Sequence, residues 1–220
     1  IFGMSKLEVE NSFINYFDKK TEIYKGMKLI DEKLGGTTPL EVILKFPKKM
    51  DENQDSENDW GDEDENDEKY WFTTDKIDKI KLVHNYLDSI EAVGKVLSFS
   101  SIIEVATKLN DNKSLGTLEM GILYTKIPDK IKKEIIDPYI SIKDSEARIS
   151  LRIKDSLDNL RRNDLLIKIN SDLENKLNLK KDEYKLGGVL ILFNNLLQSL
   201  FKSQILTLGF VMLGIFIMFI

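Results

Sequence analysis

The sequence has no cysteine and a single histidine, His84, among its 220 residues. The lack of cysteine excludes disulfides and thiolate metal ligands, and one histidine cannot build a site of several histidine ligands. An excess of basic residues is also missing, because 32 Lys and Arg stand against 37 Asp and Glu. Nucleic-acid binding proteins normally present a basic face to the phosphates. We therefore expect no metal, no cofactor and no nucleic-acid partner.

A recognisable start is missing as well. The first residue is Ile1, and no basic segment precedes an apolar stretch, so the sequence shows no signal peptide. We expect either that the start is missing or that the chain is a piece of a longer protein.

Charge is absent from the last 18 residues, "SQILTLGFVMLGIFIMFI", which begin at Ser203. A helix that crosses the hydrocarbon core needs about 20 apolar residues. The run from Ile205 to Ile220 supplies 16, and Thr207 is its only polar residue. A buried core helix is the alternative, but a run without a polar face favours a membrane span that is cut short. We therefore place a junction and a truncated transmembrane helix at 196–220.

The first 47 residues have the pattern of a β-α-β unit. "NSFINYF", at 11–17, has the aromatic and β-branched content of a short strand. A helix of about 14 residues is predicted next, because apolar residues recur on one face. These residues are Ile23, Met27, Ile30 and Leu34. "PLEVILKFP", at 39–47, has a two-residue period that predicts a strand with one buried face. We place this first unit at 1–47.

A strongly acidic segment follows, and we place a loop at 48–70. Between Asp51 and Glu68 there are eleven acidic residues and no basic one. Low apolar content and self-repulsion predict a solvated loop. A calcium-binding EF-hand loop is the alternative, but Trp60 would stand where glycine is required and Asn66 where a bidentate glutamate is expected.

The next segment, 71–137, is predicted to be mainly helical. Apolar residues recur at helical spacing between Asp75 and Ala92, and His84 lies on the flank of that stripe. "GKVLSFS" has the content of a short strand, and two brief helices are predicted after it. His84 could serve a hydrolase, but no nucleophile motif such as G-x-S-x-G accompanies it. We therefore expect a histidine on a helix surface and no catalytic residue.

Residues 138–195 again have the pattern of a β-α-β unit. "ARISLRIK", at 147–154, alternates between apolar and polar residues, which predicts a strand with one face in solvent. A helix is predicted next, because apolar residues recur at Leu166, Ile169, Leu173 and Leu177. "LGGVLILFNN", at 186–195, is almost continuously apolar, so we predict a central strand covered on both faces.

Two β-α-β units that share one sheet predict an α+β fold of the split, ferredoxin-like kind, with 71–137 as a helical insertion. The second unit runs into the apolar end through "LLQSLFKSQ", without the Gly, Ser or Pro residues of a flexible linker. A helix that rises rigidly from the domain suits the transfer of motion between domain and membrane. Four glycines are candidate caps or tight turns, or alternatively hinges, namely Gly35, Gly36, Gly187 and Gly188.

Four stretches together resemble a known family. They are "ENSFINYF", "GMKLIDEKLGGTTPLEVILKF", "RISLRIKDSLDNLRRNDLL" and "GGVLILFNNLLQSLFKSQILTLG". They are similar to the extracytoplasmic loop of resistance-nodulation-division (RND) transporters, in the MMPL-like and hydrophobe/amphiphile efflux branch. The resemblance covers residues 10–46 and about 148–209, and the acidic segment departs from the family pattern.

The resemblance implies a porter domain on the periplasmic, extracytoplasmic side of the inner cell membrane. Such transporters use proton entry, through carboxylates in their membrane helices, to export hydrophobic or amphiphilic molecules such as lipids or drugs. Those carboxylates would lie on spans outside this chain. The implied partners are the cargo, the lipid bilayer, and the other porter domain and membrane helices of the same polypeptide, with a homo-oligomer left open.

The expected function is therefore that of an exporter's porter domain without covalent chemistry. The alternative is a membrane-anchored extracytoplasmic interaction or scaffold domain without transport activity. A hydrolase that depends on His84 is a third and weaker hypothesis. Because an apolar stripe at helical spacing is usually core, we assign no substrate-binding residues.

Overall fold

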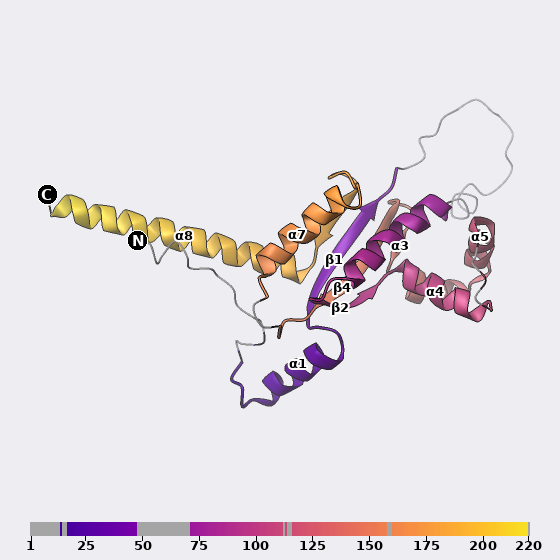
Figure 1. The fold of residues 1–220 in the computed structure, drawn as a ribbon, viewed down its shortest axis with the longest axis horizontal. Helices are drawn as coiled ribbons and strands as arrows, with labels where there is room; N and C mark the ends of the chain where they lie inside the picture. Colours follow the sequence, from indigo (N-terminus) through magenta and orange to yellow (C-terminus); the bar gives the residue numbers. More distant parts are fainter. Residues whose placement is uncertain are drawn as a thin grey trace, which may run out of the picture.

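The computed structural model describes residues 14, 17–47, 71–111, 113, 116–157 and 160–219. A sheet with helices packed on it forms the body, and one long helix projects from the body (Figure 1). The acidic segment at 48–70 and most of the strand predicted at 11–17 lie outside the described residues. Of that predicted strand, Ile14 and Phe17 are described, and neither lies in a strand.

The sheet has the strand order β2-β4-β1-β5, and all neighbouring strands are antiparallel. Its strands are β1 (Thr38–Lys45), β2 (Val93–Leu97), β4 (Glu146–Ile153) and β5 (Tyr184–Gly187). The short β3 (Ile140–Ser141) pairs with the start of β4. The protein is therefore α+β, as predicted.

The two central strands are the ones that the alternation of the sequence predicted. On β4 every second residue is buried, with Ile149 and Ile153 fully covered. Val42 on β1 stands opposite Ile149 and is also fully covered. On the other face of the sheet, Glu41 accepts an ion-pair hydrogen bond from Arg148. The period of two thus separates a core face from a charged face.

Two helices cover the apolar face of the sheet, α3 (Thr74–Asp88) and α7 (Arg162–Asn175). They bury Ile80, Val83, Leu87, Ile169 and Leu173 in one core with the strands. The chain connects β1 to β2 through α3, and β4 to β5 through α7. Two β-α-β units therefore interleave in one sheet.

The first of these units differs from the one predicted at 1–47. Helix α1 (Glu22–Lys33) precedes β1, but the helix that connects β1 to the next strand of the sheet is α3. The prediction had placed α3 in the insertion. Helical periodicity identifies a buried face, but it does not tell which strand the helix packs on.

The strand predicted at 186–195 is wrong beyond its first residues. Strand β5 ends at Gly187 and lies at an edge of the sheet, and α8 (Val189–Met218) begins immediately after Gly188. A short apolar run fits a buried strand and a helix equally well, so periodicity alone could not decide. The 30 residues of α8 form one continuous helix.

Four short helices lie at the far side of the body from α8 (Figure 1). They are α4 (Phe99–Leu109), α5 (Thr117–Lys126), α6 (Asp129–Ile131) and the π-helix η3 (Lys132–Ile136). Aromatic rings hold α4 and α5 to the core, because Phe72 lies 5.3 Å from Phe99 and 4.9 Å from Tyr124 between ring centroids. The segment predicted to be mainly helical, 71–137, holds these helices, α3 and the strand β2.

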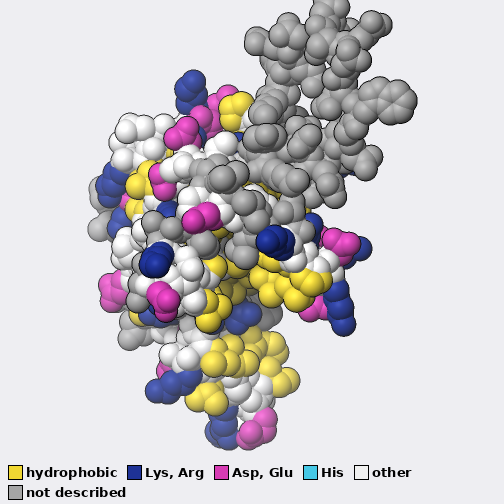
Figure 2. Space-filling view, turned by 90° about the vertical axis from the view of Figure 1, so that its right-hand side faces the viewer, with side chains coloured by type: hydrophobic (Ala, Val, Ile, Leu, Met, Phe, Trp, Pro, Cys, Tyr) yellow, Lys and Arg dark blue, Asp and Glu magenta, His cyan; other side chains and the backbone are white. Residues whose placement is uncertain are grey.

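Helix α1 stands apart from the core (Figure 1). Its predicted apolar stripe is exposed, with Ile23 at 57% and Leu34 at 60% of their full accessibility. The lower end of the molecule in Figure 2, formed by α1, accordingly presents hydrophobic side chains. Within α1 the one buried residue is Asp31.

Candidate functional site at the base of the apolar helix

Helix α8 is long and apolar enough to cross a membrane, and none of its most apolar window is buried in the protein. Over its 30 residues only Leu190 and Asn194 are buried. At about 1.5 Å per residue, such a helix is about 45 Å long. Exposed Leu, Ile, Phe and Met side chains along most of this length are compatible with lipid and costly in water. This feature supports membrane association.

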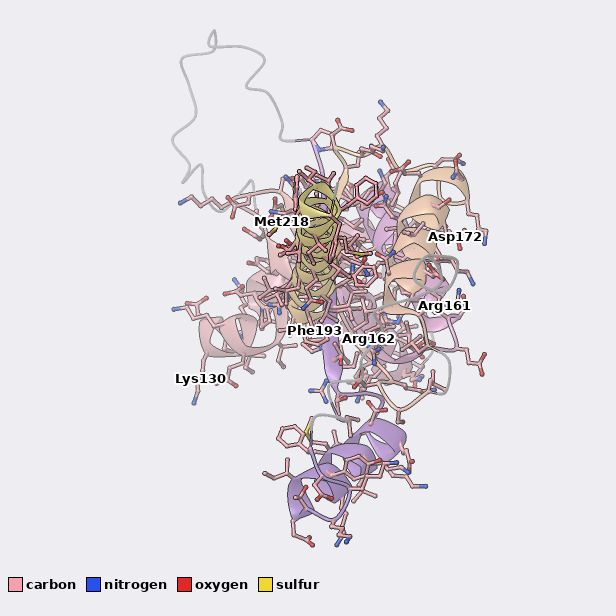
Figure 3. The ribbon with its side chains drawn as sticks, turned by 90° about the vertical axis from the view of Figure 1, so that its left-hand side faces the viewer. Lys130, Arg161, Arg162, Asp172, Phe193 and Met218 are labelled. Atoms are coloured by element: carbon pink, nitrogen blue, oxygen red, sulfur yellow. The ribbon has the colours of Figure 1, made fainter. Side chains whose placement is uncertain are left out.

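The first two turns of α8 hold it to the sheet. Gly188 has φ +101°, and a Cβ there would lie 3.0 Å from the carbonyl oxygen of Pro39. Asn194 donates a hydrogen bond of 3.1 Å to the side-chain oxygen of Asn163 on α7. Figure 3 looks along α8 from its Met218 end, with α7 beside it. The helix therefore starts from a fixed position on β1 and α7.

All four predicted glycines lie at one end of the sheet, which we call the α8 end. There β1 and β2 begin, while β4 and β5 end, as the pairing of Thr38 with Ile153 and of Glu41 with Gly187 requires. Gly187 has no neighbouring atom where a Cβ would stand and no positive φ, so its geometry does not require glycine.

Gly35 and Gly36 form the tightest contact at the α8 end. They have φ of +85° and +102°, a region that favours glycine. A Cβ on Gly36 would lie 2.5 Å from the carbonyl oxygen of Ile153, and one on Gly94 would lie 2.4 Å from the backbone of Gly35. The turn after α1 is thus pressed against both β4 and β2, which fits a cap and tight turn. A hinge role for these glycines remains a prediction.

Replacing Gly36 with Ala should lower the free energy of unfolding by about 2–4 kcal/mol, because the new methyl group meets backbone at an unfavourable φ. Gly26 offers a matched control within the preceding helix, since nothing lies within 4 Å of its Cβ position. Gly26→Ala should instead raise stability by about 1 kcal/mol. Urea unfolding in neutral detergent, followed by tryptophan fluorescence, measures both. A Gly36→Ala variant as stable as the parent would contradict the close packing.

A buried carboxylate, Asp31, ties this turn to the chain after β4. It accepts hydrogen bonds from the Thr37 hydroxyl at 2.8 Å and from the backbone N–H groups of Asp155 at 2.8 Å and Ser156 at 2.7 Å. Burial by itself would raise the pKa of Asp31, but the hydrogen bonds from Ser156, Asp155 and Thr37 outweigh burial and lower it. Asp31 is therefore a negative charge stabilised inside the protein.

A second carboxylate, Asp155, extends the cluster to α7. The guanidinium of Arg162 donates to it from both Nε and a terminal nitrogen, with the Nε distance 3.1 Å. The side chains of Asp155 and Arg162 are 0% and 6% exposed. The backbone N–H of Ile14 also donates to Asp155, at 3.2 Å. We call Asp31, Asp155 and Arg162 the junction cluster, because it joins α1, residue 14, β4 and α7.

The stability that Asp31 confers should depend on pH. Its pKa in the folded state lies below the ordinary value of 3.8, so the contribution is complete above that value and declines as pH falls through the folded-state pKa. At pH 7, Asp31→Asn should lower the free energy of unfolding by about 1–3 kcal/mol. Below pH 4, the difference in the free energy of unfolding between this variant and the parent should become smaller. Glu32→Gln, on the exposed side of α1, should change stability by less than about 1 kcal/mol at every pH.

Sequence reasoning missed the junction cluster and Gly94. One signal was present for Asp31, because it lies one helical turn from Met27 and Leu34 on the apolar stripe of α1. A carboxylate on such a stripe indicates a buried polar contact. Nothing in the local pattern pointed to Arg162.

His84 is half-buried instead of lying on an open helix surface. Its Nδ1 is 2.9 Å from the hydroxyl oxygen of Ser98, which accepts from the backbone N–H of Ser100 at the start of α4. Desolvation lowers the pKa of His84, and the carboxylates of Asp88 and Glu104 offset this only in part. Ser98 is 1% exposed. Ser98 is the N-cap residue of α4, and its contacts with Ser100 and His84 belong to that cap.

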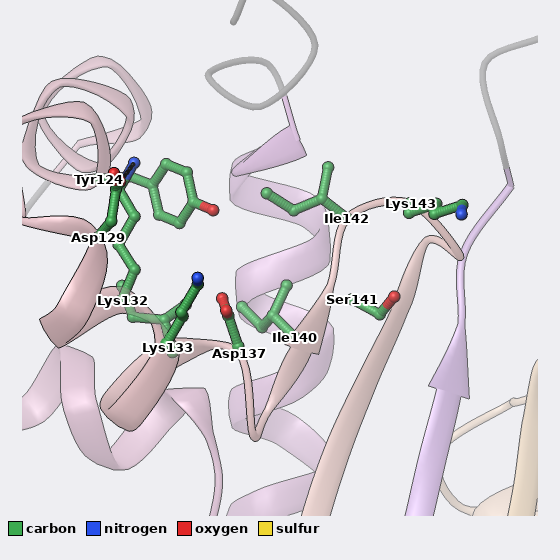
Figure 4. Close-up of a pocket in the computed structure, with 10 residues that line it drawn as sticks. Tyr124, Asp129, Lys132, Lys133, Asp137, Ile140, Ser141, Ile142 and Lys143 are labelled. Carbon is green, nitrogen blue, oxygen red and sulfur yellow. Dashed lines mark ion pairs between the residues drawn. The ribbon is translucent and has the colours of Figure 1, made fainter. Parts of the chain in front are cut away.

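An open depression of about 520 Å³ lies at the other end of the sheet, beside η3 (Figure 4). Its lining includes the cations Lys132, Lys133 and Lys143 and the carboxylates Asp129 and Asp137. The Lys132 ammonium lies 4.4 Å from the ring centre of Tyr124 and 3.8 Å from Asp129. Three cations and two carboxylates therefore share this depression.

Within the described part of the chain, no three His, Asp or Glu side chains gather closely enough to hold a metal ion. The chemically distinctive place is therefore the α8 end, where an exposed apolar helix meets a buried ionic cluster. Comparison with protein-family models, with curated proteins and with solved structures gave no match.

Proposed function

We propose that the chain is the extracytoplasmic porter domain of a proton-driven RND-type exporter of hydrophobic or amphiphilic molecules. One observation carries the proposal. Strand β5 passes through Gly187 and Gly188 into α8 without a linker, and α8 remains one helix to Met218. A domain joined to a membrane in this way moves with its membrane helix, which is what a transporter requires and a tethered soluble domain does not.

The strand order supports the same proposal. The interleaved units β1-α3-β2 and β4-α7-β5 give the order β2-β4-β1-β5. In our proposal, this order is that of a split, ferredoxin-like domain. We propose that this sheet is the porter sheet of the family, with α4, α5, α6 and η3 as the helical insertion. The resemblance of residues 10–46 and 148–209 to RND transporters is the third line of support.

The proposal assigns no covalent chemistry to this domain. It would bind cargo and change shape as the membrane helices move, on the periplasmic side of the inner membrane. Its partners would be the bilayer, the second porter domain and the remaining membrane helices of the same polypeptide. Assembly into a homo-oligomer is compatible with this arrangement.

A second function, that of a membrane-anchored interaction or scaffold domain, is favoured by helix α1. Its exposed Ile23, Leu29, Ile30 and Leu34 form an apolar surface that the described residues do not cover. Such surfaces often bind other proteins. In the exporter proposal the same surface would contact another part of the transporter.

The coding sequence that follows Ile220 separates the two functions. An exporter requires five further apolar spans, with an acidic residue inside at least one of them. A stop codon within a few residues would contradict the exporter and leave the scaffold function.

A further inference from the structure

One face of α8 is apolar and uncovered in the part of the helix that lies nearest the body. Lys202 is the only charged residue of α8, and it places the boundary between water and lipid near its own position. Before it, four large apolar side chains are at least half exposed, those of Val189, Leu192, Leu196 and Leu200. The last three follow Val189 by 3, 7 and 11 residues, the integers nearest to whole helical turns. These side chains therefore form one exposed stripe.

This stripe points away from the body. Leu190 and Asn194 are the two buried residues of α8. They lie about 100° and about 140° around the helix from Val189, since each residue advances the helix by about 100°. The helix packs on β1, β5 and α7 with that other side. Figure 1 shows α8 leaving the body with no other described element beside its outer length. A second helix along the stripe would therefore not collide with the domain.

The same face carries small side chains farther along α8, in the uncharged run. Ser203, Thr207 and Gly214 follow Val189 by 14, 18 and 25 residues, which again are close to whole turns. Val211 stands at the turn between the last two. The Thr207 hydroxyl donates to the carbonyl oxygen of Ser203 at 2.9 Å, so its polar group is satisfied within the helix. One continuous face is thus apolar before the boundary and small after it.

This change of character is the one that a contact between two helices requires when it crosses the boundary. In water, burial of apolar side chains drives association. In lipid that driving force is missing, and small side chains instead let two backbones approach closely. The small residues gain their meaning because they continue an exposed apolar stripe. We call this face of α8 the pairing face, and its residues are Val189, Leu192, Leu196, Leu200, Ser203, Thr207 and Gly214.

We propose that the pairing face binds the pairing face of a second copy of this chain, with the two α8 helices parallel and related by a two-fold axis. In such a pair each level of the helix meets its own kind, apolar against apolar in water and small against small in lipid. Lys202 lies about 140° around the helix from Val189, so the two like charges stay apart. The two bodies stand on the outer sides of the pair, which a two-fold contact requires.

The inference goes beyond the proposed function and does not rest on it. A tethered scaffold domain would pair in the same way, because the contact requires that α8 enters a membrane and not that the protein transports anything.

Single-cysteine cross-linking tests the pairing, because the 220 residues contain no cysteine. The complete gene product is used in the membranes of producing cells, with any cysteine outside these residues replaced by serine. Copper phenanthroline oxidises the sample, and non-reducing gels measure the disulfide-linked dimer. Leu196→Cys should give at least about five times as much dimer as Gln198→Cys, whose exposed side chain lies at nearly the same depth on the opposite side of α8.

A pair of glycine variants tests the part of the pairing face inside lipid. Gly214→Ile, added to Leu196→Cys, should lower the amount of dimer about tenfold, because the branched side chain keeps the two backbones apart. Gly209→Ile is the matched control, since Gly209 lies on the other side of α8. Nothing lies within 4 Å of the Cβ position of either glycine, so both variants leave the fold of one copy intact. Circular dichroism checks this.

Equal cross-linking through positions 196 and 198, or an unchanged dimer after Gly214→Ile, would overturn the pairing. The pairing and the exporter fail separately. A gene product that exports without forming the dimer would contradict the pairing, whereas a dimer in a gene product that exports nothing would contradict the exporter.

Discussion

Replacing Arg162 with Met should lower the free energy of unfolding by about 3–5 kcal/mol, because the buried carboxylate of Asp155 would lose its counter-charge. Methionine keeps much of the arginine stem, so lost packing contributes little. Urea unfolding in neutral detergent, followed by tryptophan fluorescence, measures the change. Trp71 is 5% exposed and reports on the core.

The neighbouring arginine provides a matched control for this prediction. The side chain of Arg161 is 58% exposed and lies 3.6 Å from Asp164. Arg161→Met should therefore change stability by less than about 1 kcal/mol. Equal effects of the two substitutions would contradict the role given to the junction cluster.

Two lysines placed in the apolar half of α8 should release the 220-residue chain from membranes. Leu208 and Leu213 are about half exposed along the uncharged run. Each lysine costs about 3 kcal/mol near the centre of a span, so the pair costs about 6 kcal/mol. That is a shift of about four orders of magnitude in partitioning. The fraction that remains in carbonate-washed membranes measures the effect.

The same two charges nearer the body serve as the control. Leu192 and Leu196 lie on α8 before the uncharged run and are exposed. Leu192→Lys with Leu196→Lys should leave the chain in the membrane fraction. Release by the control pair, or retention of the first pair, would mean that the end of α8 does not enter lipid.

The strands and the paired helices could be predicted where one face is buried. The alternation on β4 predicted Ile149 and Ile153 in the core, and the helical repeat predicted Ile169 and Leu173, because burial imposes a period of two or 3.6. The apolar end of α8 was predicted as a helix for a different reason, since its composition suits lipid all round.

The connections could not be predicted, because they depend on residues far apart in the chain. Asp31 and Asp155 are 124 positions apart in the chain, and Gly35, which precedes β1, contacts Gly94 in β2. A local pattern carries no information about such partners. The strand predicted at 186–195 failed for a related reason, because whether an apolar run is a strand or a helix depends on what surrounds it.

Of the candidate site, the sequence predicted the glycines but not what they touch. Gly35, Gly36 and Gly188 have the positive φ that a cap or tight turn requires. The close backbone contacts of Gly36 with β4 and of Gly188 with β1 are tertiary features. The junction cluster beside them forms only because the fold brings the start of β1 and the end of β4 together.

The most direct test measures export by the complete gene product after a flexible linker is inserted between the domain and α8. A Gly-Ser-Gly-Ser insertion between Gly188 and Val189 leaves both elements intact but breaks their rigid connection. The same insertion between Lys181 and Asp182, in the exposed turn before β5, is the control. The measurement is the accumulation of a fluorescent amphiphilic dye in energised cells. We predict that the parent and the control lower dye accumulation until a protonophore is added, and that the Gly188 insertion abolishes this effect. Full export by the Gly188 insertion, or no export by the parent, would contradict the account.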